Sequence, residues 1–203
     1  MFLALLLALA PNDALFPEAG SVAGTLATGI PYLAIGEVAY GVNDRFAAGI
    51  VGGVTPKTVG GGVRLRGVLF ERGDDRILLG SPILYYPATK GLGNEPWLLA
   101  MPQLLAERAF DVGSRLHFGA GLALAACTDA IGAALSGTLS HAHAGGGFMG
   151  GVWQTATVGG TTRLGPVIGF ADASLVFHGR RLAVHDWIGG PPVVLTLGVK
   201  RAF

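Results

Sequence analysis

The residues best suited to metal binding or catalysis lie in one stretch, Ser140-His141-Ala142-His143, which is followed by small residues and glycines. Because residues two apart point to the same side of an extended chain, His141 and His143 could together hold a divalent metal. A serine beside histidines also permits a hydrolase, for which Asp129 and the His185-Asp186 pair are candidate acids. Two histidines among small residues are more typical of a solvated loop, so we expect neither a metal site nor a catalytic group here.

The composition is unusually apolar. Of the 203 residues 51% are hydrophobic and 13% are charged, and the mean hydropathy is +0.54. Yet no stretch supplies the roughly 18 continuous apolar residues that a transmembrane helix needs. Such a chain must bury its apolar surface in a large core or present it to lipid through short alternating strands. The 34 glycines favour strands and tight turns, and the net charge of +1 argues against a nucleic-acid partner.

Residues 1–14 are predicted to be a secretory signal peptide or the remnant of one, followed by a single domain over residues 15–203. The first ten residues are apolar, and Ala8-Leu9-Ala10 matches a small-residue cleavage pattern. No Lys or Arg precedes this run, so the true start could lie upstream, or cleavage could fall a few residues later. Export also suits the single cysteine, Cys127, which can form no disulfide within the chain.

The rest of the sequence divides into alternating segments of roughly 9 to 13 residues, the length that a tilted membrane-spanning strand needs. The clearest hairpin runs from Glu37 to Gly49, with Asn43-Asp44 at its turn because both residues tolerate tight turns. Eight strands are the alternative count, because the first hairpin could be one bent strand with a tail. We predict ten strands, near residues 20–28, 31–42, 45–54, 60–70, 76–86, 96–108, 114–126, 147–158, 164–177 and 192–203.

The C-terminal segment alternates up to its last residue, Phe203, with Gly198 five residues earlier and the polar Thr196 before that. This pattern resembles the C-terminal strand of Gram-negative outer-membrane β-barrels, in which the assembly machinery recognises such a glycine and terminal aromatic together with apolar outward positions. The Tyr-Gly-Val-Asn-Asp-Arg-Phe stretch, residues 40–46, is similar to turns of the same family. Arg201 departs from the pattern, because it occupies a position that is usually apolar.

The resemblance implies an all-β fold, a closed antiparallel up-and-down transmembrane β-barrel. It implies the cell outer membrane as location, outer-membrane lipid and the barrel assembly machinery as partners, and no cofactor. In this family both termini face the periplasm, where turns are short, and the outer loops are longer. Ten strands place on the side of the termini the connections 43–44, 71–75, 109–113 and 159–163. The other side receives 55–59, 87–95, 127–146 and 178–191, with a tight turn near Gly29.

Aromatic residues are predicted to form two belts at the membrane interfaces. The belt beside the short turns and the C-terminus comprises Tyr40, Phe46, Phe70, Phe110 and Phe203. The belt at the opposite rim comprises Tyr32, Tyr85, Tyr86, Trp97, Phe148 and Phe177. A soluble barrel would instead concentrate its aromatic residues in the core, so this distribution favours a membrane protein.

Charged residues at alternate positions are predicted to point into the barrel, because an Arg that faces lipid near the membrane centre costs about 2–4 kcal/mol. Arg64 and Arg66, for example, alternate with apolar residues. The predicted inward polar residues are Glu37, Arg64, Arg66, Gln103, Glu107, Arg115, His117, Asp172, Ser174, Thr196 and Lys200. Since the inward residues of strand 45–54 are small, Glu37 is expected to meet both arginines across the interior.

The expected function follows from the size of the barrel. Small barrels are filled by their own side chains, so we expect a largely filled lumen, a structural or interaction role, and no enzymatic activity. A narrow, porin-like channel for small solutes is the first alternative, with the inward charges as its constriction. An outer-rim lipid hydrolase is the second alternative, because some outer-membrane barrels act on lipid A, and a soluble lipocalin-like binder is the last.

Overall fold

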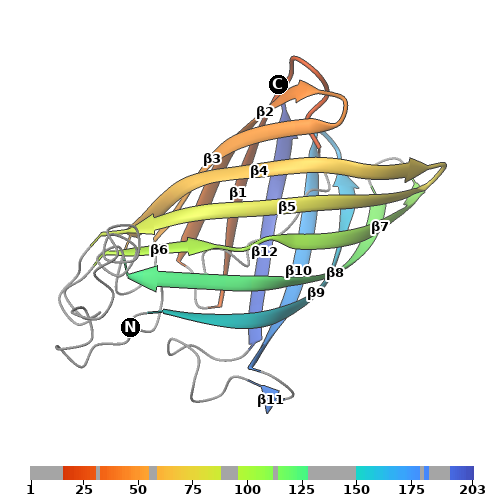
Figure 1. The fold of residues 1–203 in the computed structure, drawn as a ribbon. Helices are drawn as coiled ribbons and strands as arrows, with labels where there is room; N and C mark the ends of the chain where they lie inside the picture. The colour runs from red at the N-terminus through yellow and green to blue at the C-terminus, as the bar shows by residue number, and fades with distance from the viewer. Residues whose placement is uncertain are drawn as a thin grey trace, which may run out of the picture.

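The computed structural model of the chain describes residues 16–30, 33–54, 59–87, 96–111, 114–127, 150–178, 181–182 and 193–203. Within these residues the regular secondary structure is β-strand (Figure 1). In chain order the strands are β1 (Val22–Ile30), β2 (Ala34–Asn43), β3 (Phe46–Val54), β4 (Val59–Arg72), β5 (Asp75–Tyr86), β6 (Trp97–Ala100), β7 (Gln103–Asp111), β8 (Ser114–Cys127), β9 (Gly150–Leu164), β10 (Val167–His178), β11 (Arg181–Leu182) and β12 (Val193–Ala202). None of the described residues belongs to a helix that is long and apolar enough to cross a membrane.

The strands form a closed antiparallel barrel in up-and-down order. Each strand from β1 to β5 pairs with the next, and β8, β9 and β10 continue the series. The ring closes because β12 pairs with both β10 and β1. β6 and β7 share one position, since each pairs with β5 and with β8. The described strands therefore occupy ten positions, which confirms the predicted fold and rules out the eight-strand alternative.

The break between β6 and β7 lies at Met101-Pro102, inside the predicted strand 96–108. Proline has no N–H to donate to the ladder. The wall nevertheless stays closed across the break. The Met101 N–H donates to the Pro82 carbonyl at 3.0 Å, and the Leu122 N–H donates to the Pro102 carbonyl at 3.0 Å.

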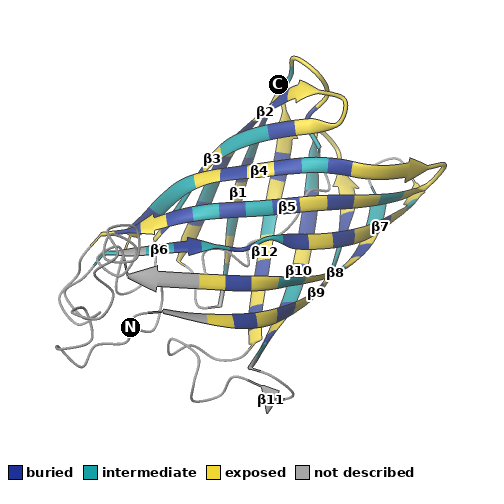
Figure 2. Ribbon diagram, in the orientation of Figure 1, coloured by how far each residue is buried: buried dark blue, intermediate teal, exposed yellow. Residues whose placement is uncertain are grey.

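The two faces of the wall differ in polarity, and Figure 2 shows the alternation of buried and exposed residues along β4 and β5. On β4, Val63 and Leu65 are exposed, while Arg64 and Arg66 between and beyond them are buried. Around the barrel, large apolar side chains are exposed on the outside, and the buried charged side chains lie within. Water-soluble proteins rarely bury Arg, Lys, Asp or Glu, so this wall has an unusual inner face.

Tight turns at Asp44-Arg45, Gly73-Asp74 and Gly165-Pro166 lie at the end of the barrel that carries the C-terminus, called the turn end below. Gly73 and Gly165 have φ angles of 59° and 63°, a left-handed conformation that glycine adopts without a Cβ clash. The short connections described by the structure thus share the side of the C-terminus, as predicted.

Three predicted connections are wrong in position. The segment 159–163 is part of β9, which continues to Leu164, and the chain turns at Gly165-Pro166 instead. Gly29 remains in β1, because it pairs with Thr196 in the ladder. The first hairpin turns one residue later than predicted, at Asp44-Arg45, where the Arg45 N–H donates to Asn43 Oδ1 at 2.9 Å.

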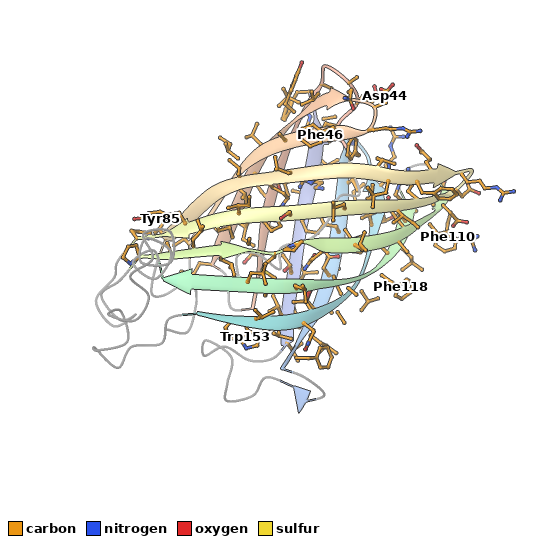
Figure 3. All side chains as sticks on the ribbon, in the orientation of Figure 1. Asp44, Phe46, Tyr85, Phe110, Phe118 and Trp153 are labelled. Carbon is orange, nitrogen blue, oxygen red and sulfur yellow. The ribbon has the colours of Figure 1, made fainter. Side chains whose placement is uncertain are left out.

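The aromatic residues of the predicted belt at the turn end, Tyr40, Phe46, Phe70, Phe110 and Phe203, are all exposed. Figure 3 shows Phe46 and Phe110 on the outer surface. At the opposite rim Tyr85 is exposed, but Tyr86 is only 1% exposed and faces the interior. Successive residues of a strand face opposite sides, so two adjacent tyrosines could not both join that belt. Phe177 is half-buried, and Tyr32, Phe148 and the side chain of Trp97 lie outside the described residues.

The seam between β12 and β1 holds all three residues of the predicted assembly signal. Thr196 is buried on the inner face. Gly198 lies beneath the ring of the buried Phe170, because a Cβ at Gly198 would overlap the ring atom Cζ. Phe203 lies outside, where its ring atom Cε2 is 3.3 Å from the position of a Cβ on Gly24. The wall at this seam is therefore closely packed on both faces.

Gly198→Ala is expected to lower the free energy of unfolding by about 1–3 kcal/mol, the usual cost of overpacking. The matched control is Gly36→Ala, because the nearest neighbour of a Cβ at Gly36 is Leu26 Cδ2 at 3.9 Å. Urea unfolding of the folded barrel measures both variants. Equal midpoints would contradict the packing of the Phe170 ring on Gly198.

Candidate functional site

Most of the polar side chains predicted to face the interior are buried. They alternate along their strands with exposed apolar residues, so the strand period places them on the inner wall. The buried members are Glu37, Arg64, Arg66, Gln103, Glu107, His117, Asp172, Ser174, Thr196 and Lys200. Arg115 is the exception, because it lies next to the first residue of β8 at the turn end and its side chain is 25% exposed.

Glu37 of β2 binds two arginines of β4 and defines the Glu37 cluster. Arg64 Nη1 donates to Glu37 Oε2 at 2.9 Å, and Arg66 Nη1 lies 2.5 Å from Glu37 Oε1. These contacts reach over β3, whose inward residues are the small Ala47, Gly49 and Val51. All three charged side chains are almost fully buried, and burial of this kind is tolerated when charges are paired.

A second carboxylate, Glu107 of β7, binds an arginine from each neighbouring strand and defines the Glu107 cluster. Arg76 of β5 donates from Nε to Glu107 Oε2 at 2.7 Å. Arg115 of β8 donates from Nη1 to the same oxygen at 3.2 Å. The cluster lies near the turn end, where the arginines are partly exposed.

His117 of β8 and Asp172 of β10 form a hydrogen bond between His117 Nε2 and Asp172 Oδ1. The strand between them, β9, contributes Gly159 at this level. A Cβ at Gly159 would overlap both the carboxylate oxygen and the imidazole nitrogen. The side-chain pair therefore occupies the space that any other residue at 159 would fill, which explains why a glycine lies inside the strand rather than in a turn.

A third contact, like those of Glu37 and His117, reaches across a small residue of the intervening strand. Gln103 Nε2 of β7 lies 3.5 Å from Thr155 Oγ1 of β9. Gly121 of β8 separates the two residues in the register, and a Cβ there would lie 2.6 Å from Gln103 Cγ. The contacts of Glu37, His117 and Gln103 each skip one strand, and they are called strand-skipping contacts below.

The Glu107 cluster and the His117–Asp172 pair belong to one row of cross-strand neighbours on the inner wall. In order around the barrel the row contains Arg76, Glu107, His117, Gly159, Asp172 and Thr196. Arg76, the first residue of the predicted strand 76–86, is an inward residue that the predicted set lacks. Its spacing of two from Leu78, which is buried, is the signal that could have placed it inside.

The segment before β1 lies against the inner wall at the turn end. Pro17 is buried, and Phe16 packs on a cluster of three buried apolar residues that are neighbours in the register, Val68, Leu78 and Leu105. This apolar cluster lies between the level of Arg66 and the level of Glu107 on the same wall. Phe16 thus covers an apolar area that charged rows surround.

Backbone hydrogen bonds hold this segment to β2. The Gly20 N–H donates to the Gly41 carbonyl at 2.8 Å, and the Gly41 N–H donates to the Ser21 carbonyl at 3.0 Å. A Cβ at Gly41 would overlap the carbonyl oxygen of Glu18. A glycine at position 41 therefore leaves room for the segment on the inner wall.

Large apolar side chains line the inner wall near the strand ends opposite the turns, and together they form the apolar layer. Each of its buried members lies near the strand end opposite the turns: Ile35, Leu84, Tyr86, Leu99, Met101, Trp153, Val176 and Val194. The interior therefore has two levels, charged pairs from the turn end to the middle of the wall and a mainly apolar layer beyond them, where Val194 and Val176 still neighbour the polar Ser174 and Thr155.

The chemistry of this site is that of a paired, desolvated network. His117 and Asp172 are an acid–base couple, but both are almost fully buried, so the described geometry offers them no access to a substrate. Among the described residues no group of three or more His, Cys, Asp or Glu side chains could hold a metal ion. The weak candidates His141, His143, Asp129 and His185-Asp186, and the predicted signal peptide 1–14, lie outside the described residues.

No protein-family model, curated protein or solved structure gives a significant match to this chain.

Glu37→Gln is expected to lower the free energy of unfolding by about 3–5 kcal/mol, because it leaves two buried guanidinium groups without their carboxylate. Water that reaches the site would reduce this loss. The control is Asp75→Asn, which breaks an exposed ion pair with Arg108 and is expected to cost less than about 1 kcal/mol. Urea unfolding in lipid vesicles compares them, and equal losses would contradict a buried Glu37 cluster.

Proposed function

We propose that the chain is a Gram-negative outer-membrane β-barrel protein with a side-chain-filled lumen and a structural or interaction role. The observation that carries the proposal is the polarity of the wall, with large apolar side chains outside and paired charges inside. Soluble monomers rarely expose an apolar patch larger than a few hundred Å². In a bilayer such a surface faces hydrocarbon, and a closed ring leaves no unpaired strand edge in lipid.

The terminal strand supports the outer membrane as the location. β12 alternates to its end, its Gly198 packs under an aromatic ring, and Phe203 follows on the outer face. These residues match the pattern that the barrel assembly machinery recognises in the family that the sequence resembles. The exposed aromatic residues near the turns also fit a membrane interface, where amphipathic rings gather.

The burial of the inner wall supports a filled lumen over a channel. A wide aqueous pore would leave its lining side chains accessible to water. Here most lining residues of both levels are buried against other protein atoms, for example Arg64 at 2% exposure and Met101 at 0%. An apolar layer also opposes ion passage, because apolar constrictions exclude water.

Val158→Arg tests the membrane assignment. Val158 is exposed near the middle of β9, and an Arg facing lipid at the membrane centre is expected to cost about 2–4 kcal/mol. Val158→Leu is the control, since it keeps the position apolar. Urea unfolding in vesicles gives the difference. A loss within about 0.5 kcal/mol, as on a water-exposed surface, would exclude lipid contact at this position.

Conductance tests the filled lumen. The wild-type protein, recovered from outer membranes as a heat-modifiable band, is expected to give no steady current in a planar bilayer, because the apolar layer and the charged network fill its interior. A steady current whose ion preference changes in Glu37→Gln would instead support the channel alternative.

A further inference from the structure

Arg201 is a cation on the outer face of the wall. Leu197 and Val199, which lie on the same side of β12 as Arg201, are exposed, whereas Thr196 and Lys200 are buried inside. This is the position at which the sequence departs from the apolar pattern of terminal strands. If the outer face lies in lipid, a guanidinium exposed there requires an explanation.

A second outward arginine at the turn end shows how the fold neutralises such a charge. Arg108 of β7 binds Asp75 of β5 through two parallel hydrogen bonds, Nε to Oδ1 at 2.8 Å and Nη2 to Oδ2 at 2.9 Å. For Arg201, the contact described within the chain is with an aromatic ring. Its Cζ lies 5.5 Å from the centre of the Phe203 ring.

Arg201 stands at one end of a groove in the outer wall, with a cavity volume of about 570 Å³. This volume lies within the range of about 300–1,000 Å³ that is typical of ligand sites. The outward side chains that border the groove are apolar and widely exposed: Leu26 at 69%, Val38 at 51% and Ile50 at 66%. Apart from Arg201, the outward side chains of this lining carry no charge.

The groove is deep because glycines occupy outward positions at its floor, where no side chain covers the backbone. Leu26, Gly36 and Gly52 are cross-strand neighbours on β1, β2 and β3. A Cβ at Gly36 would have its nearest neighbour at 3.9 Å, and one at Gly52 at 3.5 Å. The backbone at these positions is therefore uncovered and leaves room for an occupant.

The order of these features along the wall is a cation beside an aromatic ring at the turn end, followed by an apolar trough. A phospholipid has the same order, because its phosphate lies at the membrane surface and its acyl chain extends toward the centre. A guanidinium is well suited to phosphate, which it binds through two donors at once. An Arg at the membrane surface also favours lipids with net negative charge.

We propose that this groove binds one anionic phospholipid, with the phosphate at Arg201 and an acyl chain over Gly36 and Gly52. The inference rests on the membrane location proposed above and adds a specific lipid site to it. The lipid belongs to the leaflet at the turn end. Arg201 is thereby a headgroup ligand, and Phe203 holds its guanidinium in place through the cation–π contact.

The test uses the full-length barrel in detergent, titrated with phosphatidylglycerol or phosphatidylcholine of identical acyl chains and followed by native mass spectrometry. The wild type is expected to bind one phosphatidylglycerol about fivefold more tightly than phosphatidylcholine, the ratio that about 1 kcal/mol per Arg gives. Arg201→Gln is expected to abolish this preference. Gly52→Leu, which fills the trough, is expected to weaken the binding of both lipids.

Arg108→Gln is the matched control, because it removes an outward arginine at the same end that already has a carboxylate partner. It is expected to leave the preference unchanged. Equal effects of the two arginine variants, or an undiminished preference in Arg201→Gln, would overturn the proposal. A barrel dimer that Gly52→Leu dissociates would also overturn it, because the groove would then be a contact between copies. A folded, membrane-inserted barrel without lipid preference would refute this site and leave the proposed function intact.

Discussion

A charged side chain inside a narrow barrel needs a partner on the inner wall, and this requirement determines much of the structure of the interior. An unpaired buried charge is far more costly than a paired one. Glu37 and Glu107 each bind two arginines, and Asp172 binds His117. The interior can therefore be polar, filled and closed to water at the same time.

Small residues on the inner face make these pairings possible. Side chains on adjacent strands would collide if every inward position carried a large group, since the interior is narrow. Gly159 and Gly121 lie directly beneath the contacts that pass over them, and Gly49 lies in the strand that the Glu37 cluster crosses. The high glycine content of the sequence thus has a packing role in the strands themselves, beyond the few turns that need left-handed backbone.

The sequence predicted much of this arrangement, because the period of two that separates the faces is local. The apolar neighbours of Arg64 and Arg66 are enough to predict that both face the interior, and a single hairpin pattern predicts β2 and β3. The failures concern features that depend on distant residues. The sequence predicts a turn at Gly159-Gly160, because nothing local reveals that His117 and Asp172 meet above these glycines. The contact of Phe16 with three different strands could not be predicted either, since its partners are far away in the chain.

The strand-skipping contacts have a consequence for the register of the barrel. Alternation between apolar and polar residues excludes a slip of one position, because that would turn every side chain to the wrong face. It does not exclude a slip of two, which returns each residue to its own face and lets the backbone ladder form again. Such a slip of β3 alone, or of β9 alone, would change the register of that strand against both of its neighbours with little penalty in hydrophobicity. A slip of β9 would also move Gly159 away from the His117–Asp172 pair and bring Thr157 or Thr161 beneath it. Registers that differ by two residues keep every side chain on its own face. The inward glycines, and the side-chain pairs that cross them, therefore determine which of these registers is native.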